Sequence, residues 1–304
     1  MSHLFLKIQL MMMLILRKQM VTGMTLALLA VPGQAIETYR QYTKHSSNIA
    51  KASGDVSGTY KYWKDTENID ESLMSNGQAW KLNSKWQDEP FNDSLHGGHV
   101  AMDRGEELYN KLNTNGKFAN CIGTKNGNLD GLRANYYPRF NIKLNHVTGL
   151  EEMIQFCAEK QSMNLLNGSY DNSAVSVYIG SYSNGMPMNV NVSEGELKLA
   201  FERGERLFFM RTGWTNFACG TCHETFVGKH LRGQTPTTYY GDAAHWPTFR
   251  AKNELQSLHL RFTECNRSGG TQPIAIGSRE YTDLEVYLTG LSNGQPVRQP
   301  SVRN

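Results

Sequence analysis

Apolar side chains recur at helical spacing along most of the chain beyond about residue 100. Between residues 195 and 210 they lie on one face of a 3.6-residue helix, at Leu197, Ala200, Phe201, Leu207 and Phe208. Capping-box residue types at 193–196 and 148–151 predict two helix starts. A further helix is expected from roughly Glu280 to Thr289, ending at Gly290. This pattern predicts a mostly α-helical protein.

One segment departs from the helical pattern. Residues 174–179 alternate between small or polar and apolar side chains, as a strand does. The chain also resembles itself, and the counterpart of this segment at 283–288 has a helical pattern. We therefore expect a helix at 174–179 as well.

The internal repeat divides the chain. Residues 103–109 match 202–208 in residue type, and 118–119 match 217–218. Nearer the end of each half, 177–179 match 286–288, and Ser-Asn-Gly at 183–185 matches the same tripeptide at 292–294. The repeat predicts two related domains, at 96–190 and 191–304. The polar residues 36–95 before them are expected to form an N-terminal extension.

The first 35 residues have the features of a secretory signal. Lys7, Arg17 and Lys18 precede an apolar run, and Gly33-Gln34-Ala35 suits cleavage after Ala35. A membrane anchor is the alternative, and the true start codon could be Met11 or Met20. An exported mature chain would reach the periplasm, an oxidising compartment.

Composition narrows the function classes. The chain has 304 residues, 39% hydrophobic and 19% charged, which is typical of a packed globular protein. Its net charge of +3 comes from the three basic residues of the signal segment, since 28 basic and 28 acidic residues remain. Nothing in this balance favours nucleic-acid binding.

The most specific motif is Cys-Gly-Thr-Cys-His at 219–223. Two thiols at this spacing reach the vinyl groups of a porphyrin, and the adjacent His223 can ligate its iron. The motif predicts covalent haem c on Cys219 and Cys222. The alternative is a redox Cys-x-x-Cys site, which requires a strand–turn–helix setting that the sequence does not show.

The second axial position of the iron has several candidates. All thirteen methionines lie at or before Met210, so the usual methionine ligand after the motif is absent. The remaining candidates downstream are His230, His245, His259, Cys265 and a lysine. The histidines are more simply interpreted as structural or solvent-facing.

Cysteine counting adds weight to Cys265. Removing the two motif cysteines leaves three, and Cys121 and Cys157 in the first half could form a disulfide. Cys265 would then be a ligand, a reactive thiol, an intermolecular partner or an inert buried thiol. Helical spacing places it on one face with Leu255, Leu258 and Phe262.

Arg261 lies one helical turn before Cys265. A cation there would lower the pKa of the thiol and attract an anion. The alternative is a solvated arginine or one that pairs with a haem propionate.

The first half lacks the haem motif. At the equivalent position it reads Cys121-Ile122-Gly123-Thr124-Lys125, without the second cysteine or the histidine. No haem is expected there. Cys157 lies near the place that Cys265 takes in the second half, so the repeat favours a lost haem site whose remaining cysteines form a disulfide.

Taken together, the chain from about residue 100 resembles the SoxA family, the subunit of the SoxAX cytochromes of sulfur oxidation. The resemblance depends on Cys219-x-x-Cys222-His223, the segment Arg261-Phe262-Thr263-Glu264-Cys265-Asn266, and Gly277-Ser278-Arg279-Glu280-Tyr281. It implies two tandem class I cytochrome c-like domains, of which the first is degenerate and lacks haem. The single-haem type, with a disulfide in the first domain, is the expected one.

The resemblance also implies an activity. The chain would be an L-cysteine S-thiosulfotransferase that joins thiosulfate oxidatively to a cysteine of the SoxYZ carrier protein. Cys265 would be the distal haem ligand and carry a catalytic persulfide, Arg261 would hold the thiosulfate, and electrons would leave through haem toward the SoxX subunit. A second basic residue is expected among Lys229, Arg232 and Arg250, and a small accessory subunit could bind. The alternative function is a periplasmic electron-transfer cytochrome without sulfur chemistry.

Overall fold

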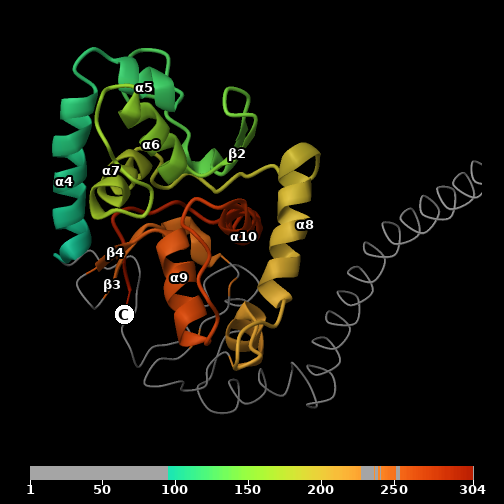
Figure 1. Ribbon diagram of the computed structural model, residues 1–304. Helices are drawn as coiled ribbons and strands as arrows, with labels where there is room; N and C mark the ends of the chain where they lie inside the picture. Colours follow the sequence, from blue (N-terminus) through green and yellow to red (C-terminus); the bar gives the residue numbers. More distant parts are fainter. Residues whose placement is uncertain (1–94, 227–235, 237–238, 240, 251–253, 304) are drawn as a thin grey trace, which may run out of the picture. The chain divides into compact units, whose positions relative to one another are not determined.

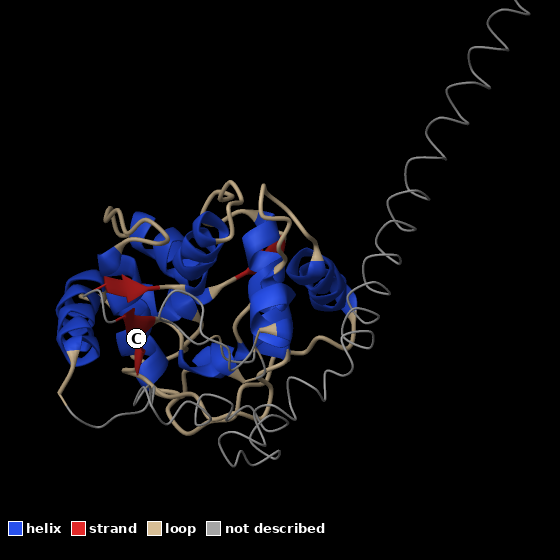
Figure 2. Ribbon diagram, turned by 90° about the horizontal axis from the view of Figure 1, so that it is seen from below, coloured by secondary structure: helices blue, strands red, loops and turns tan. Residues whose placement is uncertain are grey.

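The computed structural model describes residues 95–226, 236, 239, 241–250 and 254–303, all of them within the compact unit 50–304. The expected signal segment, nearly all of the N-terminal extension, and Lys229, His230 and Arg232 lie outside the described residues. Helices predominate and the strands are short (Figure 2). Within the described ranges, no helix is long and apolar enough to cross a membrane.

The first half is built on two helices in close contact, α4 (Gly97–Leu112) and α7 (Tyr170–Ser181) (Figure 1). Gly105 makes the approach possible, because a Cβ atom there would lie 2.1 Å from the Ala174 carbonyl oxygen. Arg104 fixes the pair through hydrogen bonds of 3.0 and 2.9 Å to the Asp171 carboxylate.

The remaining elements of the first half complete its core. They are α5 (Lys117–Ile122), the 3₁₀ turn η3 (Ala134–Tyr136), strands β1 (Arg139–Asn141) and β2 (His146–Thr148), and α6 (Leu150–Glu159). The two strands are antiparallel, with Phe140 opposite Val147. Phe118, Ile122 and Ile154 are fully buried between these helices.

The second half repeats this plan. Helix α8 (Gly195–Phe209) packs on α10 (Arg279–Gly290) (Figure 1). A Cβ atom at Gly204 would lie 2.0 Å from the Asp283 carbonyl oxygen, and Arg203 donates hydrogen bonds of 2.7 and 2.8 Å to the Asp283 carboxylate. Both helix pairs are therefore joined in the same way, by a glycine that permits close backbone contact and an adjacent arginine that pairs with an aspartate of the other helix.

Short elements link the two helices of the second pair. They are the π-helical turn η4 (Thr221–Thr225), the 3₁₀ turn η5 (Asp242–His245), β3 (Thr248–Arg250), β4 (Glu254–Gln256) and α9 (Leu258–Ser268). Strand β3 lies between antiparallel β4 and parallel β5 (Val302–Arg303). A mainly aromatic cluster forms the core here, at Phe208, Tyr239, Tyr281, Leu284 and Tyr287.

The two halves exchange equivalent contacts after α7 and α10. Asn184 hydrogen-bonds both backbone groups of Gln299, at 2.7 and 2.6 Å. Asn293, which is 109 positions after Asn184, does the same to Val190, at 2.8 and 2.9 Å. Pro187 and Pro296 form an antiparallel bridge between the two segments. The first half thus binds a segment near the end of the second half, and the second half binds the segment that ends the first. The contacts are equivalent, as in an approximate two-fold arrangement.

The helix expected at 280–289 is confirmed as α10, and residues 174–179 lie within helix α7. The strand-like alternation of 174–179 was misleading because α7 is buried on nearly all sides, from Asn172 to Val177 and at Ile179 and Gly180. A helix buried all round shows no apolar stripe.

Both predicted capping boxes are wrong. Helix α6 is capped by Gly149, because Thr148 belongs to β2 and its hydroxyl donates to the Arg139 carbonyl. Helix α8 is capped by Glu194, while the Ser193 hydroxyl donates to Asn191. Neither cap makes a side-chain hydrogen bond to its helix.

Candidate functional site

Helix α9 carries Arg261 and Cys265 one turn apart. Ser257 begins the helix, because its hydroxyl accepts a hydrogen bond from the Leu260 backbone. The expected helical face therefore loses Leu255, which lies in β4, and keeps Leu258, Phe262 and Cys265.

The Arg261 guanidinium is held in place by an acidic neighbour. Its Nη1 donates a 2.5 Å hydrogen bond to Glu264 Oε2, which also accepts one of 3.3 Å from Gln256. The Arg261 side chain is only 22% exposed, so it is restrained and faces little water. Glu264 was missed by the sequence analysis, although its position three residues after Arg261 is the spacing of a helical ion pair.

The Cys-x-x-Cys-His motif follows α8 and lies against it. A Cβ atom at Gly220 would stand 2.7 Å from the Phe209 ring, so the glycine allows the motif to approach the helix. Thr221 Oγ1 accepts a 3.0 Å hydrogen bond from the Ala218 backbone and so orders the turn that carries the two cysteines.

The structure brings the motif and α9 together. His223 hydrogen-bonds the Cys265 side chain, and the thiols of Cys219 and Cys222 both lie close enough to Cys265 to feel its charge. None of these three cysteines is in a disulfide. All four residues predicted for the haem therefore meet at one place, with Arg261 beside them.

The charge on Cys265 results from opposing effects. Burial alone would raise the pKa of its thiol, but the Arg261 guanidinium and the hydrogen bond with His223 outweigh burial and lower the pKa to about 7. Cys219 has no such cation, and burial raises the pKa of its thiol to about 12. Of these two cysteines, Cys265 is therefore the one whose side chain can be a thiolate near neutral pH.

Aromatic side chains enclose one side of the site. The Phe208 ring lies 6.5 Å from His223, 4.6 Å from Tyr239 and 5.4 Å from Tyr287, measured between ring centroids. The Tyr239 hydroxyl approaches Glu224, next to His223, at 3.5 Å, and burial raises the pKa of the Glu224 carboxyl. Such a wall suits the face of a flat, apolar ring system.

Cys121 and Cys157 form a disulfide in the first half, with an S–S distance of 2.10 Å and Cα atoms 5.8 Å apart. Cys157 lies on α6, 108 positions before Cys265 on α9. The bridge closes a 36-residue separation, which stabilises a fold by about 3–4 kcal/mol in the chain-entropy description.

The other candidate ligands and cations within the described residues are buried. His259 has Nε2 3.1 Å from Glu285, and His245 lies beside Trp246. Arg250 is a buried residue of β3.

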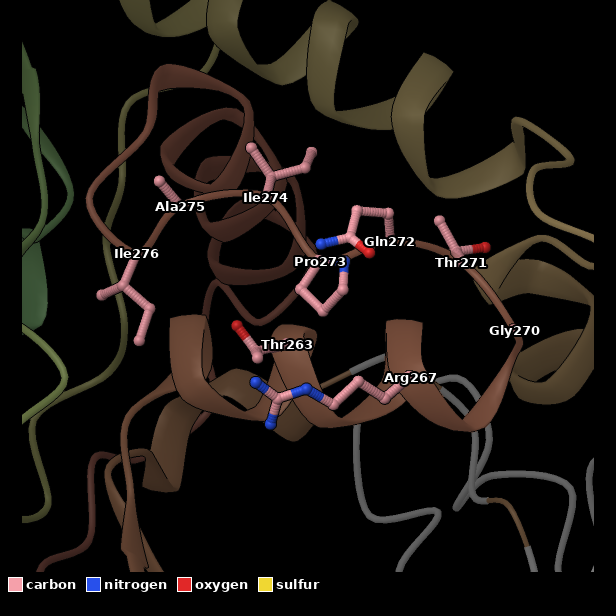
Figure 3. A pocket seen from close by; sticks show the side chains of 9 residues that line it. All are labelled: Thr263, Arg267, Gly270, Thr271, Gln272, Pro273, Ile274, Ala275 and Ile276. Atoms are coloured by element: carbon pink, nitrogen blue, oxygen red, sulfur yellow. The ribbon is translucent and has the colours of Figure 1, made fainter.

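A surface cavity of about 640 Å³ opens beside α9. Thr263 and Arg267 line it from the helix, and residues 270–276 cover it (Figure 3). Arg267 is exposed here, so α9 carries a second arginine apart from the one beside Cys265.

Comparison with known proteins decides the family. The sequence profile of the SoxA/TsdA cytochrome c domain matches residues 104–188, in the half that holds the disulfide. The L-cysteine S-thiosulfotransferase subunit SoxA of Chlorobaculum tepidum is 34% identical over 211 residues, covering 66% of this chain and 70% of the relative. The chain belongs to the SoxA family.

Other members and a solved structure agree. The SoxA subunit of Rhodovulum sulfidophilum is 31% identical over 220 residues, which cover 70% of this chain and 75% of that one. A crystal structure of SoxXA from P. pantotrophus aligns with a TM-score of 0.60 and 26% identity, over 69% of this chain and 79% of that one. This SoxA protein is thus a c-type cytochrome of an enzyme family, as its sequence predicted.

The residues present fit a covalent haem c. Two thiols at the required spacing accompany a histidine and an opposed cysteine side chain, which supply one nitrogen and one sulfur donor. The aromatic wall provides the apolar packing that the ring needs.

Proposed function

We propose that this chain is the catalytic subunit that joins thiosulfate oxidatively to a cysteine thiol of the SoxYZ carrier protein. The observation that carries the proposal is a cysteine with a thiol pKa of about 7, set beside a restrained arginine and a haem-binding motif. The relatives are named L-cysteine S-thiosulfotransferase subunits, which supports this activity.

The reaction balances as a two-electron oxidation. The carrier thiol loses its proton, a sulfur–sulfur bond forms between it and the terminal sulfur of thiosulfate, and two electrons leave. Cys219, Cys222 and His223 would hold a haem c, which would supply the electron acceptor beside the reacting sulfur. The two electrons would leave toward the SoxX partner, and the released proton goes to solvent.

Each residue of the site has a distinct part in this scheme. Cys265 would hold the haem together with His223 and would present the catalytic sulfur, as a persulfide, where thiosulfate and the carrier thiol meet. Arg261 binds the anionic thiosulfate and stabilises negative charge on the Cys265 sulfur. Glu264 holds the guanidinium in the orientation that this requires.

The architecture of the subunit follows from the repeat. We propose that residues 96–190 are a degenerate cytochrome c-like domain in which the Cys121–Cys157 disulfide replaces a haem, and that 191–304 is the domain with the one haem. The matching helix pairs, with Arg104–Asp171 and Gly105 in one and Arg203–Asp283 and Gly204 in the other, support this duplication.

Partners and location complete the proposal. The alignment with SoxXA supports a SoxX partner. Thiosulfate and SoxYZ are the substrates, a small accessory subunit is a further candidate partner, and the signal segment directs the chain to the periplasm with cleavage near Ala35.

The test compares Cys265→Ala with wild-type protein, both loaded with haem and bound to the SoxX subunit. We expect thiosulfate-dependent modification of the carrier thiol, followed by intact mass, to fall at least about 10³-fold, the scale of losing a nucleophile. Reduction of the haem by dithionite and electron passage to the partner should continue. Carrier modification at an undiminished rate would contradict the proposal and favour a pure electron-transfer cytochrome.

A further inference from the structure

Three ionisable side chains that the reaction does not use meet where the two halves join. Glu151 of α6 lines an interior cavity of about 60 Å³ together with Glu285 of α10. His259 of α9 places Nε2 3.1 Å from Glu285 Oε2. His259 is 5% exposed and Glu285 7%, so the two side chains meet with little water around them.

His259 is held from two sides. The Gly277 backbone N–H donates a 3.1 Å hydrogen bond to Nδ1, so this nitrogen is an acceptor. Nε2 lies 3.1 Å from Glu285 Oε2 but does not form a well-oriented hydrogen bond within the described part of the chain.

Glu285 lies against the start of α6. A Cβ atom added to Gly149 would lie 2.6 Å from Glu285 Oε2, so this carboxylate is positioned against the first residue before α6. The absence of a side chain at Gly149 is what allows the approach.

Glu151 lies in the first turn of α6 and lines the same cavity. Its Oε1 accepts a 2.9 Å hydrogen bond from the Ser176 hydroxyl of α7, and the Glu285 carboxylate is near enough to raise its pKa. Two carboxylates in one enclosed space do not both stay charged at low cost. A proton on Glu151 removes the conflict.

The internal repeat places these groups on the junction itself. Glu151 and His259 each occupy the second residue of their helices, 108 positions apart, and Ser176 and Glu285 are 109 apart. The Glu151–Ser176 and His259–Glu285 contacts are thus equivalents in the two halves. The cavity also holds Gln299, a 6% exposed residue whose side-chain oxygen has no hydrogen-bond partner.

We propose that Glu151, Glu285 and His259 form a positioning unit, which holds the start of α9 against the first half while Glu151 is protonated. Because α9 carries Arg261 and Cys265, the unit sets where the proposed reacting sulfur lies; only this last step depends on the proposed function. The three residues touch no substrate and act through α9.

The unit has a defined pH range. Burial, with the charge of Glu285 added, raises the pKa of Glu151 to about 7, against smaller opposing effects of its own backbone N–H, the Ser176 hydroxyl and His259. Tyr137 also lines the cavity, but its hydroxyl donates to the Ile122 carbonyl. Since the folded pKa lies above the ordinary glutamate value, this stabilisation is complete at low pH and is lost as pH rises through about 7.

Hydrogen exchange of the haem-loaded protein tests the proposal without an activity assay. In the wild type, amides in the peptide covering Leu258–Ser268 should exchange at least about fivefold faster at pH 8.5 than at pH 5.5, after correction for intrinsic rates. Glu151→Gln, which keeps the oxygen acceptor for Ser176 and stays uncharged, should abolish this change. Glu280→Gln, which removes an exposed carboxylate from the same helix as Glu285, should leave it as in the wild type.

Equal pH dependence in wild type and Glu151→Gln would overturn the proposal. A second measurement is the infrared band of a protonated carboxyl, which should be present at pH 6 in the wild type and in Glu280→Gln; its absence in the wild type would also overturn the proposal. If the exchange result holds while Cys265→Ala retains carrier modification, the positioning unit stands and the proposed function fails. If the exchange result fails while Cys265→Ala loses carrier modification, the positioning unit alone is rejected.

Discussion

At Cys265 the chemistry depends on one neighbouring side chain. Burial works against a charged sulfur, and Arg261 is the largest of the effects that reverse this. The arginine is in turn restrained by Glu264, whose carboxylate is shared with Gln256. A planar guanidinium held in this way can contact a sulfur and an oxyanion together, which an ammonium group does less well.

Replacing Arg261 with glutamine should therefore affect both binding and chemistry. We expect kcat/KM for thiosulfate to fall by about 10²-fold or more, the scale of removing one partner of a buried charge pair. In Arg261→Lys, kcat/KM should fall less. Steady-state carrier modification measures this.

Arg267→Gln is the matched control for this change. It removes the same charge from the same helix, but from the surface cavity shown in Figure 3. Losses of similar size in Arg261→Gln and Arg267→Gln would mean that general electrostatic attraction, and not the contact with Cys265, is what Arg261 provides.

For individual residues, the sequence predicted the contacts between side chains that lie close together in the chain. The spacing of Arg261 and Cys265, and of the haem motif, was sufficient to predict that they act together. The Glu151–Glu285 pair was missed because its members are 134 positions apart and each is unremarkable alone. The repeat offset, which maps Glu151 onto His259 and Ser176 onto Glu285, was the signal that could have found it.

Among the elements, the two helix pairs depend on glycines at equivalent positions. Gly105 and Gly204 each face a carbonyl oxygen of the partner helix, with no space for a methyl group. Backbone atoms of a helix cannot move aside as a flexible side chain can. Close packing, and not conformational freedom, is therefore the reason for glycine here.

Gly204→Ala should destabilise the protein despite the better helix propensity of alanine. A Cβ atom only 2.0 Å from the Asp283 carbonyl oxygen forces α8 away from α10, at a cost of about 3 kcal/mol, the upper part of the range for overpacking. Thermal unfolding of the haem-loaded protein measures this.

Gly195→Ala offers a comparison on the same helix. A Cβ atom there meets nothing within 4 Å, although its positive φ of 63° adds some strain. Gly204→Ala with stability equal to the wild type would show that α8 and α10 can separate freely.

Helix positions were predictable from periodicity, whereas helix starts were not. The residue types at 148–151 and 193–196 fit a capping box, yet Thr148 and Ser193 give their hydroxyls to Arg139 and Asn191. Leu255 was assigned to a helical face but pairs with Phe249 across β4 and β3. Each of these residues could form alternative local hydrogen bonds. The bonds that form decide whether the residue joins a helix, and the sequence does not show which of them form.

For the whole molecule, the decisive contacts are those that the halves exchange. Asn184 and Asn293 each hold a backbone segment of the opposite half through two hydrogen bonds. They flank the Pro187–Pro296 bridge, so the junction is symmetric in its polar contacts. The haem-binding half and the disulfide half are therefore coupled through equivalent contacts.

Removing either asparagine should have similar consequences. Asn184→Ala and Asn293→Ala each leave a partly buried N–H and C=O unpaired, and we expect each to lower the free energy of unfolding by about 2–3 kcal/mol. Chemical denaturation of the haem-loaded protein measures both variants.

Asn191→Ala, which removes a local contact with Ser193 on the surface, is the control and should change stability little. A large effect at Asn184 with none at Asn293 would show that the equivalent contacts do not carry equivalent energies.

The exchange also bears on the order in which the protein can be made. Gln299 is 115 positions after Asn184, and Ser301 donates hydrogen bonds to the carbonyls of His245 and Pro247. The hydrogen bonds between Asn184 and Gln299 therefore cannot form until nearly the whole chain has been synthesised. During that interval the polar groups that follow α7 are open to chaperones and proteases, and the second half that will enclose the motif cysteines is still incomplete.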